Sequence, residues 1–255
     1  MDDPDVYENG TLKNLLGIKD YDKLKEAEVN IGYLNLISAQ KELASTGKRG
    51  TELIKSVHRH IFKDIFSWAG EYRKVPIFKT EVVIPGVSLQ YSDPKNIDKD
   101  LSAAINDLEK VEWEGKSIKE KSQLFTKYLA KIWRVHPFRD GNTRTTLAYA
   151  SVFARQHGFE MDLGSILNEL SRKIDPETNT IKEYSVRDRF VLAALDENCS
   201  PEPEYLEYVV RKAILVGAKK KKRELEHLLN EHEQNEGNKS SNSKSVEKDS
   251  ELDEK

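Results

Sequence analysis

Two long apolar patterns near the middle of the chain, at residues 118–134 and 142–157, constrain the fold most strongly. Each has apolar side chains at helical spacing, and the first has a stripe wide enough to require burial. Pro137 disfavours helical backbone at the residue before it, so the first helix must end at His136. Gly158 is typical of the residue that follows a helix C-terminus. Two buried helices joined by so short a segment predict a helical core.

Further stretches with helical spacing extend this interpretation to most of the chain. β-prone residues dominate only residues 72–90, where Pro76, Pro85 and Gly86 interrupt them, so we expect a short hairpin there. The fold class is therefore mostly α. The other expected helices cover residues 20–46, 51–69, 94–110, 162–172, 183–197 and 202–229.

The end of the chain has a different composition. From Gln234 to Lys255 the only apolar residues, glycine aside, are Val246 and Leu252. Such a segment buries too little apolar surface to offset the entropy cost of ordering it. We expect a disordered tail at residues 234–255.

Charge and cysteine content exclude several classes of protein. The formal net charge of -3 leaves no basic footprint for nucleic acid, so nucleic acid is not an expected partner. The single cysteine, Cys199, excludes a disulfide framework and fits a reducing cytoplasm. The acidic N-terminus lacks the apolar stretch of a signal peptide, and no apolar run approaches the roughly 18 residues that cross a membrane. A cytoplasmic protein with no membrane partner is expected.

The short segment between the two central helices, Val135 to Arg144, concentrates groups with chemical potential. His136 has an ordinary pKa near 6.5, which suits a general base acting near neutral pH. Asp140 supplies a hard oxygen ligand for Mg²⁺ shared with phosphates. The helix that starts after Gly141 presents free N–H groups and a positive dipole end, which together bind anions.

Arg144 adds to this interpretation. A cation in the first turn of a helix is unfavourable with respect to the helix dipole, but it is well placed if an anion is bound there. A base, a metal-binding carboxylate and an anion site so close together indicate phosphoryl or nucleotidyl transfer. From these residues alone, a capped loop between two helices explains the segment equally well.

The segment resembles the signature of the Fic family, His-x-Phe-x-(Asp/Glu)-Gly-Asn-Gly-Arg-x-x-Arg, from His136 to Asn142 and again at Arg144. Residues 12–20 and 60–73 also resemble family segments that precede the signature. The resemblance implies a Fic-type helical bundle with a short β-hairpin flap. It divides the chain into a leading segment and helix at 1–50, a core domain at 51–215 with the flap at about 75–90 and the active loop at 136–144, a helical extension at 216–233 and the disordered tail.

The resemblance also implies an activity, protein adenylyltransfer. His136 would deprotonate a Ser, Thr or Tyr hydroxyl of a target protein, and that hydroxyl would attack the α-phosphate of ATP. Asp140 would hold Mg²⁺. The flap would bind the target segment by strand pairing. The residues implied in phosphate binding are Gly141, Asn142, Thr143 and Arg144, and those in the flap are Phe78, Lys79, Thr80 and Val82.

Two positions depart from the family signature. Thr143 replaces a glycine, and if that position needs a positive φ, a β-branched residue costs about 1–2 kcal/mol. Leu147 replaces the second arginine, which in the family helps to place the γ-phosphate. These departures leave two alternatives open: a different nucleotide donor, or a degenerate Fic-fold binding module without turnover.

Control and location also follow from the resemblance. Ser38 and Glu42 match part of the family's inhibitory motif, but Glu42 would lack its arginine partner because Leu147 stands in that place. Control by a separate small antitoxin-type chain therefore fits better than control by this motif. The expected location is the bacterial cytoplasm, or a second cell if the chain is a translocated effector.

Overall fold

The computed structural model describes residues 3, 5–84, 86 and 88–250, without the side chains of residues 168 and 232–250. One central helix, α5 (Asn142–Gln156), organises the described part. Nearly all of α5 is buried, and it contacts α1 (Tyr21–Leu43), α2 (Gly50–Phe62), α4 (Ile118–Val135) and α6 (Val186–Ala193). The largest fully buried side chains include those of Trp133, Tyr149, Phe125 and Phe153, so the core lies around α4 and α5.

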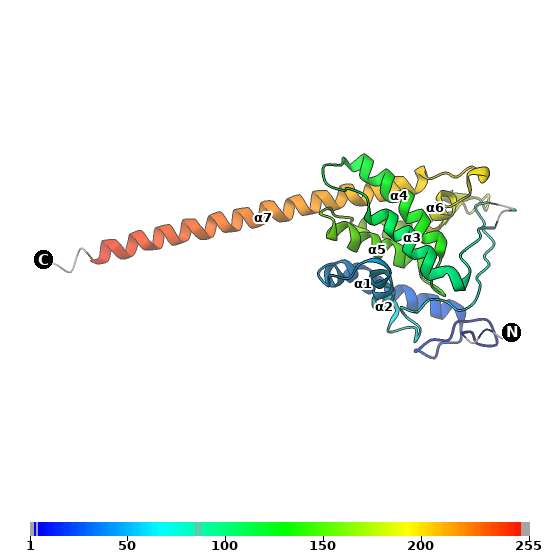
Figure 1. Cartoon of the computed structure of the whole chain (residues 1–255). Helices are drawn as coiled ribbons and strands as arrows, with labels where there is room; N and C mark the ends of the chain where they lie inside the picture. Colours follow the sequence, from blue (N-terminus) through cyan, green and yellow to red (C-terminus); the bar gives the residue numbers. More distant parts are fainter. Residues whose placement is uncertain (1–2, 4, 85, 87, 251–255) are drawn as a thin grey trace.

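The remaining elements cover this core (Figure 1). α3 (Ile97–Glu109) packs against α2 and α4, and α7 (Glu204–Ser250) packs against α4 and α6. The segment expected as a helix at 162–172 forms a 3-10 helix, and the one expected at 183–197 forms α6 followed by a short 3-10 helix. The bounds are η1 Pro94–Asn96, α3 Ile97–Glu109, η2 Leu163–Glu169, β1 Lys173–Ile174, β2 Ile181–Glu183, η3 Glu197–Cys199 and α7 Glu204–Ser250.

The boundary between α4 and α5 lies where the sequence predicts it. A capping box between Ser117 and Glu120 starts α4. The side chain of each residue accepts a hydrogen bond from the backbone N–H of the other. α4 ends at Val135, and His136 takes the left-handed conformation (φ 52°, ψ 58°) that turns the chain. α5 then begins at Asn142, directly after Gly141. The segment from His136 to Gly141 is therefore a turn between two helices that both line the core.

The expectation of a hairpin at residues 72–90 was wrong. Among the described residues there, none forms a strand; the antiparallel pair is β1 and β2, farther along the chain. The flap segment instead bonds to its neighbours. Arg73 donates to the carbonyls of Val75 and Ser92, and Glu81 turns inward to Arg187. These side-chain bonds, within the segment, to Ser92 and to α6, stand in place of the cross-strand ladder that the β-prone residues suggested.

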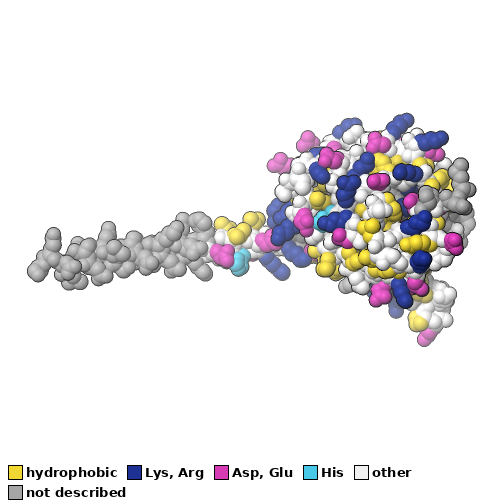
Figure 2. All heavy atoms as spheres, turned by 90° about the horizontal axis from the view of Figure 1, so that it is seen from below, with side chains coloured by type: hydrophobic (Ala, Val, Ile, Leu, Met, Phe, Trp, Pro, Cys, Tyr) yellow, Lys and Arg dark blue, Asp and Glu magenta, His cyan; other side chains and the backbone are white. Residues whose placement is uncertain are grey.

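The last helix, α7, projects far from the body (Figure 1). It continues to Ser250, past residue 234, where we expected order to end. Ala, Lys, Arg, Glu and Leu, which favour helical backbone, dominate residues 218–231, so this part of α7 can form without a buried face. Residues 251–255 lie outside the described part. Basic side chains gather where the helix leaves the body (Figure 2), and the stretch 219–223 is exposed.

Within the described residues, no helix combines the length and apolar character needed to span a bilayer.

Candidate active site

The loop between α4 and α5 is held by the side chain of Asn142. Its Oδ1 accepts from the backbone N–H of Phe138 at 2.9 Å, and its Nδ2 donates to the Phe138 carbonyl at 2.8 Å. Phe138 is fully buried and stacks on His58, with ring centroids 3.9 Å apart. The Asn142 side chain therefore braces the loop with one of the two hydrogens of its amide nitrogen. An amide NH2 carries a second donor, so the expected use of Asn142 as a phosphate ligand stays a prediction.

Arg73 fixes the turn at His136. Its Nε donates to the carbonyl of His136 at 2.8 Å, and its backbone N–H donates to the carbonyl of Pro137 at 2.9 Å. A left-handed conformation at a residue other than glycine costs about 1–3 kcal/mol and persists only where its surroundings hold it. Arg73, which is 4% exposed, supplies that restraint from the start of the flap.

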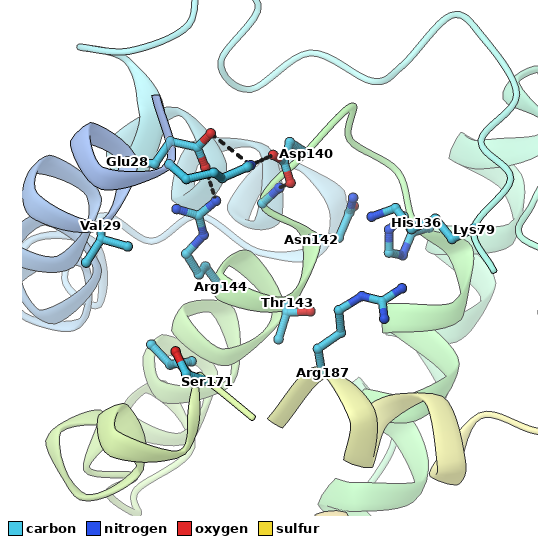
Figure 3. A pocket seen from close by; sticks show the side chains of 13 residues that line it. Glu28, Val29, Lys79, His136, Asp140, Asn142, Thr143, Arg144, Ser171 and Arg187 are labelled. Carbon is cyan, nitrogen blue, oxygen red and sulfur yellow. Dashed lines mark hydrogen bonds and ion pairs between the residues drawn. The ribbon is translucent and has the colours of Figure 1, made fainter. Parts of the chain in front are cut away.

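A pocket of about 370 Å³ opens at the N-terminus of α5 (Figure 3). This volume lies within the usual range for small-ligand sites, about 300–1,000 Å³. The residues that the sequence identified around the loop meet in its wall, together with one flap residue, Lys79. The residues lining the pocket are Lys25, Glu28, Val29, Lys79, His136, Asp140, Gly141, Asn142, Thr143, Arg144, Leu170, Ser171 and Arg187.

The imidazole of His136 is buried at the pocket wall. The residue is 2% exposed, and neither ring nitrogen has a hydrogen-bond partner among the described residues. The ring stacks on Tyr91, with centroids 4.0 Å apart. Burial first, and then the positive charges of Lys79 and Arg187, lower the pKa of His136 well below its ordinary value. The imidazole is therefore neutral near pH 7 and can accept a proton.

Asp140 belongs to a chain of charges that crosses to α1. Its Oδ2 lies 2.6 Å from Nζ of Lys25, which also lies 3.0 Å from Oε1 of Glu28. The other Glu28 oxygen pairs with Arg144. Burial would raise the pKa of Asp140, but the charges of Lys25 and Arg144 outweigh it and hold that pKa well below its usual range. Asp140 is thus a carboxylate whose charge is balanced internally.

The donor set around Asp140 fits Mg²⁺ under one condition. Mg²⁺ in enzymes is often held by one or two carboxylates together with substrate phosphates and water. No cluster of three or more His, Cys, Asp or Glu side chains is found among the described residues, so the protein alone does not form a closed metal cage. Both Asp140 oxygens have partners, Oδ2 the Lys25 ammonium and Oδ1 the backbone N–H of Gly141. A divalent cation therefore fits if the Lys25 ammonium moves away.

The two departures from the expected signature have structural explanations. Thr143 lies within the first turn of α5, and no positive φ occurs at this position. Its Oγ1 accepts from Nε1 of the buried Trp133 at 3.0 Å. Leu147 is 1% exposed and belongs to the core. Thr143 carries no backbone strain, and Leu147 contributes packing.

The flap has two faces with different exposure. Phe78 and Val82 are 87% and 60% exposed, and Thr80 is also exposed. Lys79 lines the pocket, and Glu81 is buried. The alternation is that of extended backbone, in which successive side chains point to opposite sides. Of the four flap residues named from the sequence, only Lys79 faces the pocket; the other three form the outer face.

Sequence reasoning missed Lys25, Glu28 and Arg187. A signal for Glu28 existed, because it falls in the buried stripe of α1 with Leu24 and Gly32, where an unpaired carboxylate is out of place. Arg187 had no signal, since only the fold brings α6 to the pocket.

Glu42, by contrast, lies outside the pocket lining. It is 58% exposed, with its Oε2 3.7 Å from Nδ1 of His60. Ser38 bonds the other nitrogen of that ring at 2.7 Å. The partial inhibitory motif therefore makes a local contact with α2, as its weak match suggested.

Comparison with known proteins identifies relatives of the part of the chain that contains this site. Residues 50–154 match the family model described as Fic/DOC family. The chain is 30% identical over 155 residues to Protein adenylyltransferase VbhT of Bartonella schoenbuchensis, covering 61% of this chain and 31% of VbhT. It is 29% identical over 168 residues to Probable protein adenylyltransferase y4lH of Sinorhizobium fredii, covering 64% of this chain and 80% of that protein. This chain thus spans about a third of VbhT but most of y4lH.

A solved structure shares the fold. The crystal structure of BepC from Bartonella tribocorum, described as a VirB-translocated effector with bound AMPPNP, aligns with a TM-score of 0.61. The alignment covers 82% of this chain and 95% of BepC at 18% identity. At that identity the likeness shows a common fold.

Proposed function

We propose that this chain is a protein adenylyltransferase, on the premise that residues 50–154 match the Fic/DOC family model. It transfers AMP from ATP to a Ser, Thr or Tyr hydroxyl of a target protein. The observation that carries the proposal is the buried, neutral imidazole of His136, with both nitrogens unpartnered, at the wall of a pocket that opens on the N-terminus of α5. The names of the relatives, protein adenylyltransferases, support the same reaction class.

The chemical step joins the hydroxyl oxygen of the target to the α-phosphorus of ATP. His136 accepts the hydroxyl proton as that bond forms, and the bond between the α-phosphorus and the bridging oxygen to the β-phosphate breaks. The products are the AMP ester of the target and pyrophosphate, and His136 releases its proton to solvent or to pyrophosphate. A neutral base held beside the acceptor oxygen contributes through position as much as through basicity.

The N-terminus of α5 supports phosphate binding in this proposal. The first N–H groups of a helix have no partner within the helix, and their dipoles attract negative charge. Gly141 gives the chain the left-handed turn (φ 73°) that exposes these groups. Its missing side chain also leaves room for the ring of Phe62, against which an added Cβ would clash. Arg144, in the same turn, adds a guanidinium for phosphate oxygens.

Mg²⁺ is part of the proposal through Asp140. When bound, the ion would neutralise charge on the phosphates and on the pyrophosphate that leaves. The carboxylate of Asp140 is ionised and faces the pocket. Lys25 must leave that carboxylate first, so metal and nucleotide bind at the expense of an internal ion pair.

The outer face of the flap is the proposed binding surface for the target. Phe78, Thr80 and Val82 are exposed; Phe78 and Thr80 flank Lys79 on the opposite side of the backbone, and Val82 lies in the turn that follows. An extended target segment can pair with such backbone and place its hydroxyl near the pocket. Replacing Phe78 by Ser removes apolar contact without touching the pocket. Labelling of the target should fall while self-labelling or ATP hydrolysis stays unchanged; an equal fall in both would contradict this role.

The experiment that tests the function is mass spectrometry of a cell lysate treated with the chain and a mixture of nucleotides. A mass increase of AMP on protein hydroxyls, absent in a lysate treated with His136→Ala, is the expected result. A different added group would identify another nucleotide donor. The absence of any added group, with partner binding unaffected by His136→Ala, would instead support a binding module without turnover.

We extend the proposal to partners and location. The target is a protein with a reactive hydroxyl, and a small antitoxin-type chain is the proposed inhibitor. An inhibitor in the cell would make the chain less active in its own lysate than after purification. Equal activity of the same amount of chain in both would contradict such an inhibitor. The proposed location is the bacterial cytoplasm, with delivery to another cell as the alternative. Fractionation of the source culture and its host separates the two.

A further inference from the structure

Four cations line the pocket, and they form two groups. Lys25 and Arg144 are neutralised by Glu28 and Asp140 on the side of α1. Lys79 and Arg187 lie on the other side, next to His136 (Figure 3). Asn142 and Thr143, at the N-terminus of α5, separate the two groups in this view. On the His136 side, Arg187 pairs with Glu81 from outside the pocket lining, and Lys79 forms no ion pair with a described residue.

Arg187 is held rigidly with its charge toward the pocket. Its two terminal nitrogens donate to the two oxygens of Glu81 at 2.7 and 2.8 Å. Glu81 is buried and also accepts from Tyr91 Oη at 3.0 Å. A guanidinium has five N–H donors, more than this carboxylate occupies. Glu81 therefore orients Arg187 without using up its capacity to bind a second anion.

Lys79 brings a second, unpaired cation to the same place. It points inward from the flap, and its ammonium forms no ion pair with any described residue. Burial lowers the pKa of Lys79, while the nearby charges of Asp140 and Glu81 act in the opposite direction. An ammonium group in so desolvated a position gains most from an anion that comes with the ligand.

His136 supplies an independent indication of a ligand here. Its ring is buried, and both nitrogens lack partners among the described residues. Buried polar atoms are almost always hydrogen-bonded, so an unpartnered pair at a pocket wall marks a position that a bound molecule completes. A ligand that satisfies the imidazole lies within the field of Lys79 and Arg187.

We propose that Lys79 and Arg187 form a second anion-binding subsite, beside His136, that takes a phosphate group of the nucleotide donor. The subsite rests on the proposed function for its ligand and adds to the anion site at the N-terminus of α5. Because it adjoins the base, it holds the phosphate that is attacked and balances the negative charge that grows on its oxygens. Lys79 is thus assigned to phosphate binding, whereas its place in the flap had indicated that it binds the target protein.

The test is calorimetric titration of the full chain with inorganic tripolyphosphate, which requires neither a target nor turnover. Lys79→Met should weaken tripolyphosphate binding on the order of tenfold, the effect of losing one charge-assisted contact. Arg187→Lys keeps the charge but loses the planar fork, so it should weaken binding while the fold remains. Lys74→Met is the matched control, because it removes the same charge from an exposed flap position outside the pocket. It should bind as the wild type does.

The titration is repeated in a Glu28→Gln background, where Arg144 is no longer neutralised. Equal binding by Lys79→Met and Lys74→Met would overturn the subsite. So would the absence of tripolyphosphate binding in both backgrounds. A chain that binds tripolyphosphate through Lys79 but transfers no nucleotide would retain the subsite and contradict the proposed function. If the Lys79→Met variant transfers AMP and binds ATP with unchanged affinity, the result would support the proposed function and contradict the subsite.

Discussion

Oε2 of Glu28 lies 2.5 Å from Nη2 of Arg144, so a buried carboxylate of α1 occupies the arginine in the first turn of α5. Lys25, one turn before Glu28 on α1, forms an ion pair with Asp140 in the same way. In the proposed reaction, phosphate and metal would therefore compete with contacts that the chain makes to itself. An ion pair of this kind costs much to break from one side, because the other charge is left buried.

Replacing Glu28 by Gln should raise the affinity for nucleotide. The amide keeps the shape of the carboxylate but removes the charge that neutralises Arg144, so phosphate no longer displaces an ion pair. An effect on the order of tenfold in Kd is expected, about 1.4 kcal/mol. Titration of ATP into the full chain measures it.

Glu26→Gln is the control for this change, because Glu26 is exposed on the same helix. It should leave the affinity unchanged. If Glu28→Gln binds ATP no better than Glu26→Gln, the ion pair does not restrain the site.

The pH dependence of transfer should show the lowered pKa of His136. The neutral imidazole is the active form, so the rate falls as pH drops through its pKa. Burial, Lys79 and Arg187 place that pKa well below 6.5, and the rate should still be on its plateau at pH 6.5. Lys79→Met removes one positive neighbour, so its acid limb should move to higher pH. A wild-type limb centred at or above pH 6.5 would contradict the burial of the base.

Gly141→Ala should disrupt the active loop. The residue has a φ of 73°, and an added Cβ would overlap the ring of Phe62. Gly158→Ala has a similar φ of 83° but meets no atom within 4 Å, so it isolates the backbone cost. We expect a loss of about 1–2 kcal/mol in unfolding free energy for Gly158→Ala and a further 1–3 kcal/mol for Gly141→Ala. Denaturant unfolding measures both, and equal losses would exclude the clash.

Thr143→Gly should destabilise the chain rather than restore a more active loop. The change leaves Nε1 of the buried Trp133 without its acceptor, which costs about 1–3 kcal/mol. Glycine is also a poorer helix former than threonine, which adds about 0.3 kcal/mol. Thermal unfolding of Thr143→Gly beside Thr143→Ser, which keeps the hydroxyl, separates the two costs. A glycine variant as stable as the wild type would show that the indole finds another partner.

The sequence predicted the parts of the site that are local in the chain. Pro137 and Gly141 place the turn and the start of α5, because backbone preference acts over neighbouring residues, and the signature from His136 to Arg144 folds into one pocket wall. The expected flap strands were wrong, because Arg73 and Glu81 bond to His136 and Arg187 of the body and no described flap residue forms a ladder. Glu28 and Arg187 reach the pocket only through the packing of α1 and α6 on α5, which spacing along the chain does not encode.

The most direct measurement compares wild type and His136→Ala for two quantities, AMP transfer from labelled ATP and the Kd for ATP. Removal of the base should reduce transfer at least a hundredfold, as expected when a general base is lost, while Kd changes less than threefold. Transfer that survives in His136→Ala, or transfer and binding that fall together, would contradict a pocket built around this imidazole.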